Sequence, residues 1–97
     1  MLISNMNHKC NKLHETVHSM LSNSYQERFL AEQAQLIIRI EKLETFLDKY
    51  EKNLLDFKPN CPVELLYRQL AYMKAYLQTL NEREQYEFKS QNQERKN

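Results

Sequence analysis

The sequence predicts an all-α protein: an antiparallel hairpin of two long helices preceded by a short N-terminal helix. Three observations predict this fold. None of the 97 residues is glycine, which removes the best residue for tight β-hairpin turns and the backbone that phosphate-binding loops need. Apolar residues recur at alternating steps of three and four, the spacing of one helix face. A short connector with both prolines separates the two longest apolar patterns, and helices joined so closely must lie antiparallel.

Residues 1–24 form the predicted N-terminal segment. A helix from about Asn5 to Leu21 is expected because its apolar residues are four and three apart, namely Met6, Cys10, Leu13, Val17 and Met20. Three short polar residues then interrupt the pattern. The last of them, Ser24, is the expected N-cap of the next helix, and Glu27 three residues later completes the signature of a capping box.

The first long helix is expected over residues 25–56. Its stripe persists without interruption through Phe29, Gln33, Leu36, Ile40, Leu43, Leu47, Tyr50 and Leu54. Some 30 residues at 1.5 Å each make a rod of roughly 45 Å, whereas a compact monomer of this size has a radius of gyration near ~12.5 Å. We therefore expect a bend, a partner subunit, or both.

Residues 57–62 are the predicted connector, and the second long helix is expected over 63–89. Pro62 suits the first turn of a helix, so the N-cap would be Asn60 or Cys61, with Asn60 preferred for its side chain. The stripe of this helix is Leu66, Leu70, Met73, Leu77 and Leu80. Residues 90–97 form a polar tail that should fray.

The chain carries more large apolar residues than one two-helix seam can bury. Those left over are Tyr25, Ile37, Phe46, Tyr72, Tyr76 and Tyr86. Small domains with thin cores often gain stability by association. A homo-oligomer that buries a second face is therefore predicted.

Composition argues against several functions. Lys and Arg number 14 against 13 Asp and Glu, with no run of like charge, so DNA or RNA binding is not predicted. No stretch of 18 apolar residues could cross a membrane, and two distant cysteines fit a reducing cytosol. The sequence contains no recognisable Ser/His/Asp order or paired-carboxylate site, so no enzymatic activity is predicted.

Cys10, His14 and His18 are candidate metal ligands, because they share one helix face at steps of four. No carboxylate follows at the next step, and Cys10 already belongs to the apolar stripe. A buried thiol with two surface imidazoles explains the pattern better. No metal and no cofactor are predicted.

Tyr25 and Arg28 are the candidate ligand-binding residues at the start of the first long helix. An aromatic ring, a guanidinium and a positive helix end suit a nucleotide, because the ring can stack on a base while the cations meet phosphate. The plainer alternative is a hydrophobic staple with Arg28 in solvent. Arg39, Lys42 and Arg83 read as ordinary surface cations on composition alone.

The order of residues over about 25–84 resembles a family of small phage-encoded helical proteins that defeat CBASS immunity by sequestering its cyclic oligonucleotide signals. It is also similar to short gut-phage proteins with the same two-helix pattern. The resemblance rests on two motifs, Tyr25-x2-Arg28-Phe29-x2-Glu32-x3-Leu36 with Arg39-Ile40-x-Lys42-Leu43-x2-Phe46-Leu47, and Glu64-Leu65-Leu66-x2-Gln69-x3-Met73-x2-Tyr76-x3-Leu80-x2-Arg83.

The resemblance implies a non-catalytic homohexamer that binds cyclic dinucleotides between subunits, and in some members cyclic trinucleotides at separate sites. Tyr25 would be the stacking aromatic, and the phosphate-binding lysine of the family falls near Arg39 or Lys42. Arg83 would occupy the arginine position of a trinucleotide site. The implied place of action is the cytoplasm of an infected bacterium. Two alternatives stay open: a structural or adaptor protein without a nucleotide site, and a small phage regulator of a host enzyme.

Overall fold

The computed structural model describes residues 12–90, and all of its regular structure is helical. No strand occurs within these residues, so the all-α prediction is confirmed. The chain order is a 3-10 turn η1 (Leu13–Thr16), a short helix α2 (Val17–Met20), the long helices α3 (Tyr25–Glu51) and α4 (Val63–Glu84), and a π-helical turn η2 (Gln85–Ser90).

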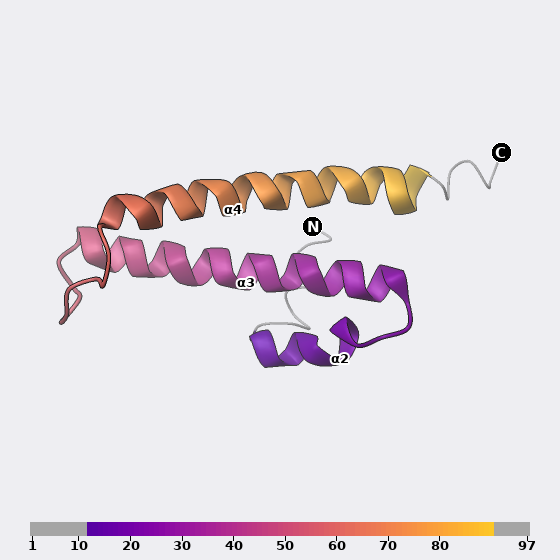
Figure 1. The fold of residues 1–97 in the computed structure, drawn as a ribbon, viewed down its shortest axis with the longest axis horizontal. Coiled ribbons are helices and arrows are strands. Elements are labelled where there is room, and N and C mark those ends of the chain that lie inside the picture. The colour runs from indigo at the N-terminus through magenta and orange to yellow at the C-terminus, as the bar shows by residue number, and fades with distance from the viewer. Residues whose placement is uncertain (1–11, 91–97) are drawn as a thin grey trace.

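Helices α3 and α4 lie antiparallel, as the short connector predicts, and α2 lies along the other side of α3 (Figure 1). Helix α3 has 27 residues, or ~40 Å of helix, in a molecule measuring 56 × 24 × 22 Å. Its radius of gyration of 16.4 Å exceeds that of a compact domain. The first long helix is therefore too long to fit within a compact domain, as its predicted length indicates.

The central position of α3 explains an imbalance in burial. Nine residues of α3 are buried, whereas Leu80 is the one buried residue of α4. The main cluster joins Phe29, Leu36 and Ile40 of α3 to Leu80. Partly buried side chains complete it, namely Leu30, Leu70, Met73, Leu77 and Phe88. The apolar stripes read from the sequence meet in this seam.

The N-terminal segment differs from its prediction. In place of one helix from Asn5 to Leu21, the described part contains only η1 and the single turn of α2; residues 5–11 lie outside the described residues. Val17 and Met20, expected in the apolar stripe, are 48% and 43% exposed. The buried residue is instead Thr16, whose Oγ1 donates to the Leu13 carbonyl at 2.7 Å and accepts from Gln35 Nε2 at 2.8 Å.

Ser24 caps α3 as predicted, because its Oγ accepts from the backbone N–H of Glu27 at 3.2 Å. The other half of the expected capping box is replaced. The backbone N–H of Ser24 donates to Ser22 Oγ at 3.0 Å, so a second serine supplies the bond expected from the Glu27 carboxylate.

Helix α3 is shorter than the expected 25–56, because a C-terminal stop ends it at Glu51. Asn53 adopts a left-handed conformation with φ of 59°. Its N–H bonds to the Tyr50 carbonyl at 3.1 Å, and the N–H of Leu54 bonds to the Lys49 carbonyl at 2.9 Å. These two bonds define a Schellman motif, which usually places glycine at the left-handed position. Asparagine, the best substitute, takes that place in this glycine-free chain.

Helix α4 begins at Val63, as predicted, but its N-cap differs from the prediction. Its N-cap is Pro62, not Asn60 or Cys61, and no side chain caps it. The proline ring holds φ at −56° while ψ of 134° keeps the residue outside the helix, and its carbonyl accepts from the Leu65 N–H at 3.0 Å. Proline thus both ends the connector and starts the helix.

Polar bonds along the hairpin supplement the thin core. Tyr76 donates to a Glu32 carboxylate oxygen, Tyr67 donates to Glu51, and Lys74 pairs with Glu44 at 2.8 Å. Within the described part of the chain, no helix is long and apolar enough to cross a lipid bilayer.

The large apolar residues predicted to be surplus divide between two environments. Ile37 is 9% exposed and therefore buried within the chain, contrary to its expected outward position. Tyr72 and Tyr86 are 68% and 76% exposed. The surplus is thus real for the tyrosines of α4 and η2 but not for Ile37.

Candidate functional site

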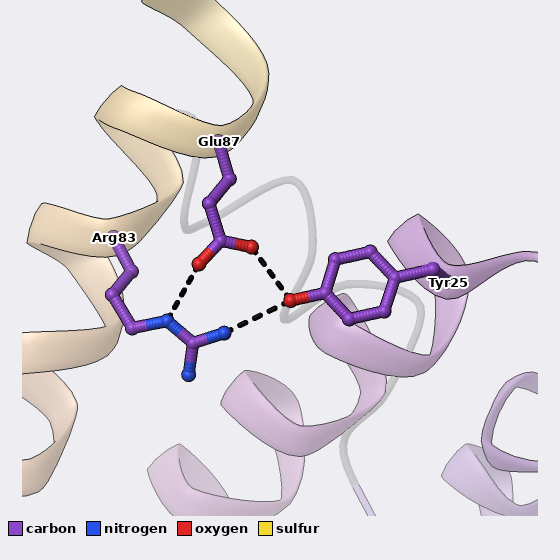
Figure 2. A network of polar contacts seen from close by, with 3 residues as sticks. All are labelled: Tyr25, Arg83 and Glu87. Carbon is purple, nitrogen blue, oxygen red and sulfur yellow. Dashed lines mark hydrogen bonds and ion pairs between the residues drawn. The ribbon is translucent and has the colours of Figure 1, made fainter.

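The candidate site lies at the end of the hairpin opposite the connector, where the start of α3 meets the end of α4. Tyr25 begins α3, and Arg83 lies in the last turn of α4. The antiparallel arrangement therefore joins two candidate residues that are 58 positions apart: Arg83 Nη2 donates to the Tyr25 hydroxyl at 2.9 Å. Figure 2 shows both side chains pointing toward one another.

Glu87 of η2 completes a closed triangle with them (Figure 2). The Tyr25 hydroxyl donates to Glu87 Oε1 at 2.6 Å, and Arg83 Nε donates to Glu87 Oε2 at 2.7 Å. Arg83 and Glu87 are four residues apart, so successive helical turns place them together. Each of the three side chains thus contacts the other two.

Aromatic rings support this triangle. Phe29 and Phe88 meet edge to face with ring centroids 5.2 Å apart, and the Tyr25 ring lies 6.0 Å from that of Phe88. The Arg83 guanidinium carbon lies 5.0 Å from the Phe29 ring centroid, within cation–π range. Because Phe29 also belongs to the main cluster, the triangle rests directly on the core.

The charges of the triangle are set by its own members. The Arg83 guanidinium lowers the pKa of the Glu87 carboxyl below its ordinary value, and the Tyr25 hydroxyl lowers it further. The hydrogen bond to Glu87 in turn raises the pKa of Tyr25 above its ordinary value. At neutral pH the triangle therefore contains one cation, one anion and one neutral phenol.

Tyr25 remains half exposed, at 49%, although its hydroxyl is held by two partners. A ring fixed in position and open to solvent can stack on a nucleobase without first losing much side-chain freedom. The arrangement is therefore suited to holding a planar, anionic ligand.

Arg28 lies one turn into α3 from Tyr25. Its Nη1 donates to the Ser22 carbonyl at 2.7 Å, which ties the guanidinium to the segment before the helix. The side chain is exposed. Arg28 thus adds a second cation to the end of the molecule where Tyr25 and Arg83 meet, and it is not the free solvent cation of the staple alternative.

Arg39 and Lys42 lie elsewhere. They are 14 and 17 residues beyond Tyr25 on the same helix, which places them ~21 Å and ~26 Å along its axis. Both side chains are exposed, and neither forms an ion pair with any residue from 12 to 90. Lys42 borders a shallow depression together with Ile38, Glu41 and Thr45. Arg39 and Lys42 therefore lie outside the group of contacts that joins Tyr25, Arg83 and Glu87.

Sequence reasoning missed Glu87, Phe88 and the participation of Phe29. The spacing of Arg83 and Glu87 could have suggested their pairing, because oppositely charged residues four apart commonly interact on a helix. Nothing in the local pattern indicates that Tyr25 joins them from 62 residues away.

A metal centre has no support in the part of the chain that is described. Between residues 12 and 90, no three His, Cys, Asp or Glu side chains are grouped to hold an ion. His14 and His18 are both exposed, and Cys10 lies outside the described residues.

A second surface feature lies on α4. An open, mostly apolar groove of about 330 Å³ is lined by Leu65, Arg68, Gln69, Tyr72, Met73 and Tyr76. Leu65, Tyr72 and Tyr76 are each at least 45% exposed. Arg68 shares the groove with the rings of Tyr72 and Tyr76, and the groove presents a face that another protein surface could cover.

Comparison with known proteins adds one finding. A model of the Sequestin family matches residues 23–86, about two thirds of the chain. The match includes all of α3 and α4, and it starts beside the cap of α3. No curated protein and no solved structure matches the chain significantly. The chain belongs to the Sequestin family, the anti-CBASS cyclic-nucleotide sponges that its sequence resembles.

Proposed function

We propose that this protein is a phage-encoded sponge that binds cyclic di- or trinucleotide messengers and hides them from host CBASS immunity without cleaving them. The observation that carries the proposal is the family match, which spans Tyr25, Arg28 and Arg83. The structure supports it, because the antiparallel hairpin brings a half-exposed aromatic ring and two arginines to one end of the molecule.

The proposed site is shared between copies of the chain. In one chain, Arg39 and Lys42 lie ~21 Å and ~26 Å from Tyr25 along α3, away from the Tyr25–Arg83 contact. A neighbouring copy can supply either cation. A cyclic dinucleotide has two phosphates and approximate two-fold symmetry, so two identical chains can offer each half the same groups. The proposed assembly is a homohexamer in the cytoplasm of the infected bacterium.

The exposed surface of α4 supports association. Its apolar groove and its exposed tyrosines are the kind of surface that an oligomer buries. The same surface also favours the second candidate function, an adaptor that docks another protein and has no nucleotide site. Light scattering tests the proposed assembly: the sponge should form one discrete assembly near six chains, whereas a monomer or an open filament contradicts it.

Calorimetry tests the proposed function itself. We expect 3′,3′-cyclic GMP–AMP or another member of a panel of cyclic di- and trinucleotides to bind tightly, and to be recovered intact after heat denaturation. Consumption of the ligand would contradict the sponge mechanism, and no binding by any ligand would favour the adaptor. Loss of binding in Arg39→Ala but not in Lys42→Ala would assign the phosphate contact to Arg39, and the reverse result would assign it to Lys42.

A matched pair of variants isolates the aromatic ring. Tyr25→Ala removes the stacking surface and should weaken binding between about fivefold and about 150-fold, the range for one base–aromatic contact. Tyr25→Phe keeps the ring, the stacking surface, and removes only the hydroxyl with its hydrogen bonds to Glu87 and Arg83. It should therefore bind far better than Tyr25→Ala. Equal losses in both variants would show that the hydroxyl, and not the ring, recognises the ligand.

A further inference from the structure

Glu87 occupies the groups that the proposed site would offer to an anion. Its Oε2 accepts from Arg83 Nε at 2.7 Å, and its Oε1 accepts from the Tyr25 hydroxyl at 2.6 Å. A carboxylate presents two oxygens at a spacing similar to the two non-bridging oxygens of a phosphodiester, and guanidinium groups pair with both anions in the same way. Glu87 therefore stands where a ligand phosphate would bind.

The backbone holds Glu87 in this place. It lies on η2, a π-helical turn that continues α4, and such turns are rare and often accompany functional sites. The next residue, Phe88, packs edge to face on Phe29 of α3, which fixes the turn against the hairpin. The family match ends at residue 86, so Glu87 lies just beyond the matched positions.

The pair is also accessible enough to be opened. The side chains of Arg83 and Glu87 are 45% and 30% exposed, and ion pairs at such partly exposed positions are weak. A ligand phosphate can reach Arg83 from solvent, and the released carboxylate can be hydrated. A ligand phosphate can therefore replace Glu87 as the partner of Arg83.

We propose that Glu87 is an internal competitor that a ligand phosphate displaces from Arg83 and from the Tyr25 hydroxyl. This inference rests on the proposed function. In the free protein, Glu87 neutralises Arg83 and keeps the arginine and the tyrosine in their binding positions. An anion must outcompete the attached carboxylate, so Glu87 sets a threshold that favours ligands which also stack on Tyr25 over small free phosphates.

The test is Glu87→Gln, which keeps the size of the side chain and removes its charge. Calorimetry with 3′,3′-cyclic GMP–AMP and with cyclic triadenylate should show about two- to fivefold tighter binding than wild type for the ligand that uses Arg83, the range expected from losing one partly exposed competing ion pair. The gain should shrink at high salt, because the unmasked Arg83 charge is screened. The melting temperature of the free variant should fall slightly, since the pair no longer stabilises the fold.

Glu82→Gln is the matched control. It removes the same charge from the last turns of α4, and Glu82 contacts the uncharged Gln78 at 3.3 Å. Its affinity should stay at the wild-type value, whereas an equal gain would show a general effect of net charge and overturn the inference. Glu87→Asp keeps the charge but shortens the reach to Tyr25, so it should compete less well and bind ligand more tightly than wild type. If Glu87→Gln loses helical circular dichroism, Glu87→Asp takes over the comparison, and binding equal to or weaker than wild type overturns the inference.

The failure of the inference can be told from the failure of the proposed function. If wild type binds a cyclic nucleotide and Glu87→Gln binds equally or more weakly, Glu87 is not a competitor while the sponge function stands. If neither protein binds any cyclic nucleotide, both proposals are overturned. A variant that melts lower yet binds tighter supports the inference, because a purely structural role would lower both properties.

Discussion

Replacing Leu80 with alanine is expected to destabilise the hairpin more than its single position suggests. Leu80 is 1% exposed and is the only α4 residue that packs fully buried against the Phe29, Leu36 and Ile40 cluster. Large-to-small substitutions at such sites cost roughly 2–5 kcal/mol, because a cavity remains where the side chain was. We expect about 3 kcal/mol, since the other contacts between α3 and α4 prevent the seam from closing over the gap.

The assay is thermal and urea unfolding followed by circular dichroism, with protein concentration held constant because association shifts apparent stability. A loss of about 3 kcal/mol should lower the melting temperature by about 12 °C or more in a domain of this size. Leu54→Ala is the matched control: Leu54 is 66% exposed, and its truncation should change stability by no more than about 0.5 kcal/mol. Equal shifts in the two variants would refute the assignment of the cluster around Leu80 as the core.

Two further predictions concern the connector end of the hairpin. Asn53 has φ of 59°, so Asn53→Gly should be at least as stable as wild type in urea unfolding, and Asn53→Ala should be less stable than either. The glycine and alanine variants should differ by about 1 kcal/mol in free energy of unfolding. Equal stability of these two variants would contradict the left-handed stop. Hydrogen bonding to Glu51 raises the pKa of Tyr67 to about 12, so the neutral form of Tyr67 favours the folded state. Its contribution to the stability of the fold is complete below pH ~10 and is lost as the pH rises through about 12. Ultraviolet titration should show more than one phenol ionising late in wild type, because the pKa of Tyr25 is raised as well. In Glu51→Gln the titration of one of them, Tyr67, should return toward ~10, and an unchanged titration curve would contradict the bond.

The long helices could be predicted from the sequence because their signals are local. Apolar residues at steps of three and four, a serine before Tyr25, and proline at position 62 act through neighbouring residues only. The structure confirms the hairpin and the Ser24 cap. The stop at Asn53 was missed because several asparagines occur in the chain, and only the completed Schellman turn distinguishes this one.

The candidate site could be predicted as a set of residue types but not as an arrangement. The chemistry of Tyr25 and Arg28 and the family resemblance at Tyr25 and Arg83 identify these residues, yet the triangle with Glu87 requires residues 58 and 62 positions apart to meet. Likewise, the sequence placed Arg39 and Lys42 on the same helix as Tyr25, but the site that we propose for them requires a second copy of the chain.

The sequence by itself determined that the protein is helical, where its long helices begin, and which faces they bury, because helix formation and capping are short-range and their residues are close in the chain. Tertiary structure alone decided that α3 lies between two neighbours, that Thr16 and not Val17 is buried, and that Glu87 faces the Tyr25–Arg83 pair. The physical reason is that these features depend on the register of the hairpin. Shifting α4 along α3 by one turn would move Arg83 and Glu87 about 5.4 Å from Tyr25 and leave every local sequence signal unchanged.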